Sequence, residues 1–391
     1  MIASHADQPS TSKGHVSLAE LALVFLKLGT MAFGGPAAHI AMMEDEFVRK
    51  RHWITEAEFL DRLAAASLIP GPSSTEVAIF IGQSKRGWAG LVVGGCCFII
   101  PAAVLVTLIA AAYARYGALP QVAGVLYGIK PAVIAIILQA LWSLSRTAIK
   151  TKLLAVIGVI AVVLNASGVA PLIVIAVAGI AACTAARREG KGTAAPLAIP
   201  PFRRLFVFLI GTPAVAVTVP VSLVRLFLSF LKIGAIVFGS GYVLLAFLRA
   251  EFIENLHWLT EKQLIDAVAV GQFTPGPVFT TATFIGYLVG GIAGAVLATI
   301  AIFLPGFVLV ASSGPLIPKL RQSALASAIL DGVVVGSLAL MGVVAWQLGR
   351  AAIVDWRTVV ILIASAVLVI RFRVNSAWVI AGAALCGWIF H

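Results

Sequence analysis

Charged residues are scarce in this chain of 391 residues. Asp, Glu, Lys and Arg together make up 11% of the sequence, whereas apolar residues make up 61% and the mean hydropathy is +1.05. A soluble domain of this length does not bury that much apolar surface, so the composition excludes soluble enzymes and soluble binding modules. The fold class that remains is an all-α polytopic membrane protein.

Cysteine is also scarce, and the sequence lacks the motifs of several catalytic classes. The four cysteines lie in apolar stretches, with neither a C-x-x-C spacing nor a histidine cluster nearby; they are Cys96, Cys97, Cys183 and Cys386. We therefore expect no disulfide and no metal site. A nucleophile triad, a metal-binding helix motif and a G-x-x-x-x-G-K-[ST] phosphate loop are absent. We expect no enzymatic activity, no cofactor and no direct use of ATP.

Acidic residues number only 16 against 28 Lys and Arg, which gives a formal net charge of +12. The basic residues form short clusters between apolar segments, the pattern of cytoplasmic loops in a membrane protein. The charge therefore indicates the lipid bilayer as a partner, and not nucleic acid. Residues 1–17 are polar and lack the apolar core of a signal peptide, so we expect a flexible tail.

The sequence contains an internal duplication. FLKIG at Phe230–Gly234 repeats FLKLG at Phe25–Gly29 with an offset of 205, and eighteen of the forty-eight positions between Phe25 and Pro72 are identical in the second copy. The identities include Lys, Glu, His, Trp and Asp, which apolar bias alone does not produce. We expect two homologous repeats, residues 18–186 and 222–391, joined by a basic linker and apolar connector at 187–221.

Each repeat carries Pro-Gly-Pro inside an apolar segment, at Pro70–Pro72 and at Pro275–Pro277. Proline removes a backbone donor and clashes with the preceding turn. In lipid the freed carbonyls have no water to bond, so a broken helix survives only inside protein or beside a wet cavity. Paired breaks in matching positions of two halves are typical of a transporter's binding site. The alternative is a pair of proline kinks with only a packing role.

A helix that starts at the second proline of each triplet suits an anion. Its first N–H groups have no helical partner and carry a partial positive charge. Serine and threonine hydroxyls add donors for a tetrahedral oxyanion. The predicted substrate-binding residues are Lys27, Gly71, Pro72, Ser73, Ser74, Thr75, Lys232, Gly276, Pro277 and Thr280. The two lysines recur in both repeats and would attract the anion; snorkelling to the interface is the alternative.

Three carboxylates are candidates for coupling or gating. Glu76 lies one turn after Pro72, where it can bind a proton, although its repeat counterpart is Thr281. Asp61 and Asp266 recur at the mouths of the broken segments, where helix capping is the alternative. Residues with a structural role in the shared motif are Phe33, Gly34, Gly35, Pro36, Trp53, Phe238, Gly239 and Trp258.

The charges predict that the two repeats have opposite orientations in the membrane. Arg49–Arg51 corresponds to Glu254–Leu256, and a loop that loses its basic residues has changed sides. With residues 18–43 as one span and each Pro-Gly-Pro segment as a re-entrant hairpin, we expect about ten crossings in total. If the Pro-Gly-Pro segments cross instead, Leu205–Val221 must also cross, which gives about thirteen.

Several motifs together resemble the chromate ion transporter (CHR) family in its long, two-domain form. They are FLKLGTMAFGGP, EFVRKRHWIT and LIPGPSSTEVAIFIG in the first repeat, and FLKIGAIVFGSG and FTPGPVFTTATFIGY in the second. The resemblance implies a secondary active exporter that carries chromate across the cell's inner (cytoplasmic) membrane and confers chromate resistance, with sulfate as a look-alike substrate. Glu76 departs from the small or amide residue expected in that family. A sulfate or other oxyanion transporter and a passive anion channel remain alternatives, and a homodimer is a further possibility.

Overall fold

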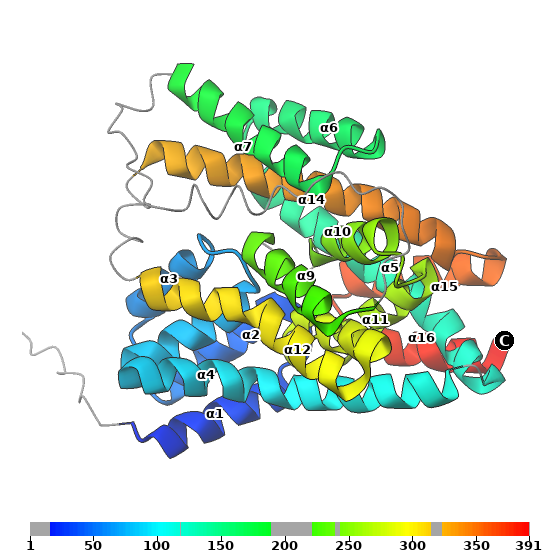
Figure 1. The fold of residues 1–391 in the computed structure, drawn as a ribbon, viewed down its shortest axis with the longest axis horizontal. Helices are drawn as coiled ribbons and strands as arrows, with labels where there is room; N and C mark the ends of the chain where they lie inside the picture. The colour runs from blue at the N-terminus through cyan, green and yellow to red at the C-terminus, as the bar shows by residue number, and fades with distance from the viewer. Residues whose placement is uncertain (1–15, 118, 189–220, 239–242, 314–322, 391) are drawn as a thin grey trace, which may run out of the picture.

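The computed structural model describes residues 16–117, 119–188, 221–238, 243–313 and 323–390. Within these ranges every regular element is a helix and there is no strand (Figure 1). The all-helical class expected from the sequence is therefore confirmed. Most of the expected N-terminal tail, most of the 187–221 linker, and Gly239 lie outside the described residues.

The described helices follow the duplication. Those of the first repeat are α1 (Leu18–Met31), α2 (Gly35–Glu44), the π-helix η1 (Asp45–Lys50), α3 (Glu56–Ala66), α4 (Ser73–Tyr116), α5 (Pro120–Ala148), α6 (Lys152–Ala166) and α7 (Pro171–Arg188). Those of the second are α9 (Leu223–Ile236), α10 (Leu244–Leu248), the π-helix η2 (Arg249–Asn255), α11 (Glu261–Phe273), the 3₁₀-helix η3 (Val278–Thr280), α12 (Thr281–Ser313), α14 (Ala324–Ala352), α15 (Trp356–Ile370) and α16 (Ser376–Phe390).

The first apolar segment is a hairpin, and not the single span from 18 to 43 that the sequence led us to expect. Gly34 has φ +105° and Gly35 has φ +78°, which are backbone conformations that favour glycine. Pro36 then lies in the first turn of α2, where its missing N–H is harmless. The chain turns back at this point, so that Phe47 of η1 packs 5.1 Å, ring to ring, from Phe25 of α1.

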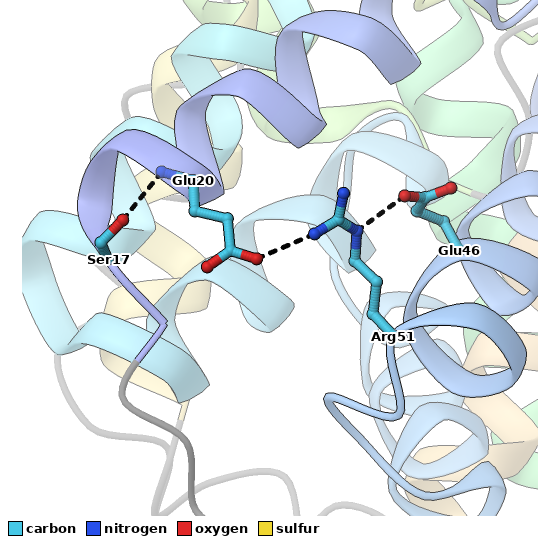
Figure 2. A network of polar contacts seen from close by, with 4 residues as sticks. All are labelled: Ser17, Glu20, Glu46 and Arg51. Atoms are coloured by element: carbon cyan, nitrogen blue, oxygen red, sulfur yellow. Dashed lines mark hydrogen bonds and ion pairs between the residues drawn. The ribbon is translucent and has the colours of Figure 1, made fainter.

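Figure 2 shows the open end of this first hairpin. Arg51, which follows η1, binds Glu20 of α1 at 2.9 Å and Glu46 of η1 at 2.7 Å. Ser17 caps α1 by accepting a hydrogen bond from the Glu20 N–H at 3.1 Å. The start of α1 and the end of η1 therefore lie on the same face of the molecule. Because the count of about ten crossings used 18–43 as one span, it is not confirmed.

The Pro-Gly-Pro segment forms the tip of a second hairpin. Helix α3 leads in, with Thr55 and Glu58 making a capping box at its start, and the first segment of α4 (residues 73–85) leads back. Lys85 at the end of that segment donates to the carbonyl of Trp53, just before α3. The two arms are therefore antiparallel and roughly 15–20 Å long at the helical rise per residue. After a break at Arg86–Gly87, the second segment of α4 (residues 88–116) begins.

The second repeat has the same two hairpins. The rings of Phe230 in α9 and Phe252 in η2 are 4.8 Å apart, as in the first hairpin of the first repeat. Thr260 and Gln263 make the matching capping box at the start of α11. Helix α12 breaks at Gly290–Gly291, as α4 does at Arg86–Gly87. The duplication inferred from sequence is therefore also a duplication of backbone structure.

The second segment of α4 passes the hairpins of both repeats. The carbonyl of Phe98 abuts Gly29 in the first repeat's α1. One turn further on, Ala102 abuts Gly276 in the other repeat's Pro-Gly-Pro loop, and Tyr113 reaches Asp266 in α11. The two sets of hairpins thus lie toward opposite ends of this segment. Figure 1 shows α4 and α12 side by side along the long axis of the molecule.

The remaining helices of each repeat pack against helices of the other repeat. Helix α5 packs on α15 and α16, whereas α14 packs on α6 and α7. Within the described ranges, five helical stretches suit a membrane crossing by length and composition: Ser73–Tyr116, Val122–Ala148, Pro171–Arg188, Val278–Ser313 and Ala324–Ala352. Three shorter helices, α6, α15 and α16, are also apolar. These helices agree with a polytopic membrane protein.

Candidate functional site

The tips of the hairpins meet at one place, which we call the junction: Ala32, Pro70–Pro72, Val237 and Pro275–Pro277. The Gly71 N–H donates to the carbonyl of Val237 at 2.7 Å, and the Gly276 N–H donates to the carbonyl of Ala32 at 2.9 Å. Each Pro-Gly-Pro loop is thereby bonded to the first hairpin of the other repeat. The structure brings together the two breaks that the sequence singled out.

The junction is closed to solvent. Pro70–Pro72 and Pro275–Pro277 are buried, and Ser74 and Thr75 beside them are only 1% exposed. Any ion at this position leaves its hydration shell behind, which costs several kcal/mol unless the protein supplies replacement donors. The polar groups that face the junction are therefore the first candidates for a functional role.

Glu76 is the most exceptional of these groups. Its side chain is fully buried, and neither carboxylate oxygen has a hydrogen-bond partner among the described residues. The Glu76 carboxylate folds back over the Pro-Gly-Pro loop, so that a Cβ on Gly71 would clash with Oε1. Gly306 of α12, in the other repeat, faces the same carboxylate. Thr75 Oγ1 is likewise buried without a partner. Such orphaned groups in a folded protein call for a ligand, an ion or water.

The start of α4 differs in detail from the expectation. Pro72 is the N-cap and Ser73 the first helical residue, so the helix begins one residue later than predicted. The Thr75 N–H was expected to be available for an anion, but it donates to the Pro72 carbonyl at 2.7 Å. The Ser74 N–H precedes the first complete turn and has no helical carbonyl to bond.

His39 was not anticipated from sequence, yet it lies at the junction. It is 1% exposed in α2, with Nε2 3.0 Å from the Ala32 carbonyl and Nδ1 3.3 Å from Ser74 Oγ. Its ring also meets Phe98 edge-on, with centroids 5.7 Å apart. The available clue was a histidine in an apolar stretch whose counterpart in the second repeat is Leu244.

In the second repeat the corresponding hydroxyls are satisfied locally. Thr280 Oγ1 donates to the Pro277 carbonyl at 2.8 Å, and Thr281 Oγ1, at the position of Glu76, donates to the Val278 carbonyl at 2.8 Å. A short 3₁₀ turn precedes α12 here, where α4 starts directly as an α-helix. The predicted site residues on this side are present at the junction, but their hydroxyls are occupied.

The two predicted lysines lie away from the junction, midway along the first hairpins. Lys232 forms an ion pair with Glu251 of η2 at 3.1 Å, and Ser229 donates to the same carboxylate at 2.8 Å. Lys27 is exposed and lines a hollow between α1 and η1 together with Asp45 and other residues. Among the described residues neither lysine contacts a Pro-Gly-Pro loop.

Asp266 belongs to a buried ionic group that joins the repeats. Its side chain is fully buried, 3.4 Å from Lys130 Nζ in α5, and it accepts a hydrogen bond from Tyr113 in α4 at 2.8 Å. Asp61, its counterpart, is exposed. Sequence reasoning missed Lys130 and Tyr113 because they lie more than a hundred residues from Asp266.

The remaining motif residues shape the hairpins. Gly34, Gly35 and Pro36 make the first turn, and Phe33 beside them is 37% exposed. Trp53 stacks on Phe47 at 5.4 Å, and Trp258 packs on Phe252 at 6.2 Å. Phe238 follows α9 and is half-buried. No group of three or more His, Cys, Asp or Glu that could hold a metal ion occurs among the described residues.

Two interlocked helical repeats, with broken segments that meet between them, agree with a polytopic membrane protein and suit a transporter. A sequence profile identifies the family of the chain. The chain belongs to the Chromate transporter family, whose profile matches residues 19–183 and 224–388, once for each repeat. The resemblance inferred from the sequence motifs is thereby confirmed.

Individual relatives match over most of their length. The chain is 33% identical over 385 residues to the chromate transport protein of Cupriavidus metallidurans, covering 96% of this chain and 94% of the relative. It is 32% identical over 361 residues to the probable chromate transport protein of Synechococcus elongatus, covering 88% of each. An uncharacterized transporter of Methanocaldococcus jannaschii is 28% identical over 390 residues. No solved structure is significantly similar to the chain.

Proposed function

We propose that this protein is a secondary active transporter that exports chromate across the cytoplasmic membrane and thereby confers chromate resistance. The observation that carries this proposal is the family match over both repeats, together with relatives named for chromate transport. The junction supports it, because a transporter needs a site between two structural units that can open to either face.

The direction of transport follows from the charge of the substrate. Moving one elementary charge across a potential of 100 mV is worth about 2.3 kcal/mol. A doubly charged anion therefore gains roughly twice that amount on leaving a cell with a negative interior. An exporter of chromate works with the membrane potential, whereas an importer needs a coupled ion to work against it.

The oxyanion binds at the junction in this proposal. The Ser74 N–H lies in the first turn of α4, and the partial positive charge of a helix start favours an anion. The unpartnered Thr75 Oγ1 lies beside it. Lys27 and Lys232, on the hairpin arms, attract the anion toward the protein and are not part of the inner site.

Glu76 couples the anion to a proton. Two unit charges of the same sign 4 Å apart repel by about 4 kcal/mol at an effective dielectric constant of 20. An ionised Glu76 at the junction would therefore oppose a bound dianion, whereas a protonated Glu76 would not. Because no cation neutralises this carboxylate among the described residues, we infer that it binds a proton when chromate binds.

The two repeats are inverted with respect to the membrane in this proposal. The opposite placement of the hairpins along α4 supports it, as does the distribution of charge. One face gathers Arg49–Arg51, Lys85, Lys150 and Arg188, which favours a cytoplasmic location for this face by the positive-inside rule. Ser17 lies on this same face because the first hairpin turns back. Arg188 and Leu223 then lie on opposite faces.

Single cysteines test the inversion, in a background without the four native ones. Lys50 and Asn255 are both exposed, occupy corresponding positions, and lie on opposite faces in the proposed topology. We expect an impermeant thiol reagent on intact cells to label position 255 and not position 50. Labelling of both positions, or labelling of position 50 alone, contradicts the proposed topology; permeabilised cells control for reactivity.

Chromate flux into everted membrane vesicles tests the transport activity. Vesicles that contain the protein should accumulate chromate, and an imposed proton gradient should change the initial rate. Excess sulfate should compete, because the two dianions have the same charge and tetrahedral shape. Equal chromate accumulation in control vesicles overturns the proposal. Flux that follows the electrochemical gradient of chromate alone, at every proton gradient, identifies a passive anion channel instead.

A further inference from the structure

A buried histidine, His39, connects three parts of the junction. It lies in α2, and its Nδ1 is 3.3 Å from Ser74 Oγ in the first turn of α4. Its Nε2 is 3.0 Å from the carbonyl of Ala32, which also accepts the hydrogen bond from the Gly276 N–H of the other repeat. The imidazole therefore touches the first hairpin, the start of α4 and, through one shared carbonyl, the second Pro-Gly-Pro loop.

The partners of His39 fix its hydrogen-bonding state. A backbone carbonyl only accepts, so Nε2 carries a proton and donates to Ala32. In the neutral ring Nδ1 is then an acceptor, and the Ser74 hydroxyl donates its proton to it. The Ser74 hydroxyl is consequently unable to donate to an anion while His39 is neutral.

We propose that His39 is a proton-binding residue of the oxyanion site, whose protonation reverses its hydrogen bond with Ser74 and frees the serine hydroxyl to donate to the bound anion. This inference rests on the proposed function. A proton from solution adds to Nδ1, and the new N–H donates to Ser74 Oγ. The Ser74 O–H then points to the anion, and no covalent bond to carbon or chromium changes. The imidazolium also brings one positive charge to the junction.

The second repeat shows that packing alone does not require this pair. The position of His39 is occupied there by Leu244, and that of Ser74 by Phe279, both buried. In the second repeat an apolar pair therefore occupies the positions of His39 and Ser74, and a short 3₁₀ turn precedes α12 there. A buried polar pair at the matching place in the first repeat points to a ligand, since a structural role is filled more simply by leucine.

Several titratable groups lie on the elements next to His39. On α4, Glu76 and the thiols Cys96 and Cys97 lie closest along the helix, and the groups farther along it are Lys85, Arg86, Tyr113, Arg115 and Tyr116; α1 carries Glu20 and Lys27, and the end of α2 with η1 carries Glu44, Asp45, Glu46, Arg49 and Lys50. The charges of α1 and η1 lie along the arms of the hairpin or at its open end, away from its tip. Glu76 is the group at the junction that can exchange a second proton, so the test separates the two residues.

The test is chromate flux into proteoliposomes as a function of pH, with purified full-length wild-type protein and the variants H39Q, H39L and S74A. H39L installs the residue of the second repeat, and H39Q keeps a polar side chain of similar length. In wild-type protein we expect the KM for chromate to fall as the pH falls. In H39Q and H39L we expect KM at acid pH to rise about tenfold, as for one lost charge-assisted hydrogen bond.

Chromate itself takes up a proton near neutral pH, so the quantity to compare is the ratio of variant to wild-type KM at each pH. This ratio should grow toward acid pH for both His39 variants and, more weakly, for S74A, which retains the positive charge. For E76Q, whose side chain is uncharged at every pH, the ratio should stay near one at acid pH and fall below one at alkaline pH, where wild-type Glu76 has to take up a proton. Size-exclusion profiles report whether each variant is folded.

Three outcomes decide the matter. A ratio that stays at one across the pH range for folded H39Q overturns the role of His39 while the proposed function stands. A ratio that is raised but independent of pH identifies a structural role and also overturns the proton switch. Wild-type protein that carries no chromate overturns the proposed function, and this inference with it.

Discussion

The two repeats share a backbone but not a chemistry. Each contributes two hairpins, a Pro-Gly-Pro tip and a long helix broken near its start, and each tip bonds the other repeat through one glycine N–H. At the junction the first repeat supplies His39, Ser74 and Glu76, whereas the second supplies Leu244, Phe279 and Thr281 at the same positions. The scaffold is symmetric, and the titratable groups are on one side.

This difference separates what the fold needs from what the site needs. Residues that are identical in both repeats, such as the glycines of the tips, are needed for the turn and for the close approach of the chains. Residues that differ between the repeats are not needed for the turn or the close approach. A transporter has to open to two faces in turn, and an asymmetric set of polar groups makes those two states unequal in energy.

The ionic group around Asp266 also occurs only once, but it lies beside the hairpins of the second repeat. Lys130 of the first repeat pairs with Asp266 of the second, whereas the residue that corresponds to Lys130 is Val334 and Asp61 is exposed. This pair therefore joins the repeats on the side of the second repeat's hairpins alone. It is a candidate for the contact that keeps that side closed.

The largest effect is expected from breaking this pair. Lys130→Met leaves the fully buried Asp266 without its cation, and breaking a buried ion pair from one side typically costs about 3–5 kcal/mol. We expect a large drop in the thermal unfolding temperature of the purified protein in detergent. Val334→Met is the matched control at the corresponding position and should change that temperature little.

A double variant distinguishes the ion pair from a general packing defect. Lys130→Met with Asp266→Asn removes both charges, and much of the lost stability should return because no buried charge remains unpaired. If the double variant is less stable than Lys130→Met by the full additive amount, the two side chains do not interact in the folded protein.

The next largest effect concerns the coupling carboxylate. Glu76→Gln keeps the shape of the side chain and removes the exchangeable proton, so we expect the stimulation of chromate flux by a proton gradient to disappear. Flux driven by the chromate gradient alone should remain measurable. The matched control is Thr281→Ser, which keeps the hydroxyl that bonds the Val278 carbonyl and should leave the stimulation intact. Gradient-stimulated flux in Glu76→Gln would remove Glu76 from the coupling mechanism.

Part of this architecture could be predicted from the sequence because the sequence contains two copies of the same pattern. Matching polar residues at a fixed offset revealed the duplication, and the two Pro-Gly-Pro triplets marked the breaks that meet at the junction. These features depend on local backbone chemistry, which proline and glycine determine wherever they occur.

What the sequence did not reveal depends on tertiary contacts. Residues 18–43 have the length and hydropathy of one span, and only Gly34, Gly35 and Pro36 mark the turn that makes them a hairpin. The contact of His39 with Ser74, and that of Lys130 with Asp266, join segments far apart in the chain. A comparison of the repeats position by position would have singled out His39, Ser74 and Lys130, because the residues at the corresponding positions are the apolar Leu244, Phe279 and Val334.

The smallest effects are expected for substitutions of Lys27 and Lys232, the two lysines of the first hairpins. Lys232 is half-buried and paired with Glu251, so Lys232→Met should cost on the order of 1 kcal/mol of stability, whereas the exposed Lys27→Met should cost close to nothing.

If both lysines attract the anion from solution, both variants should raise the KM for chromate a few-fold at low salt. Because mobile ions screen such attraction, the increase should fade as ionic strength rises. Lys27→Arg, which keeps the charge, is the control. A KM increase that persists at high salt would mean that the lysines contact the bound anion directly, which would move the inner site toward the arms of the hairpins.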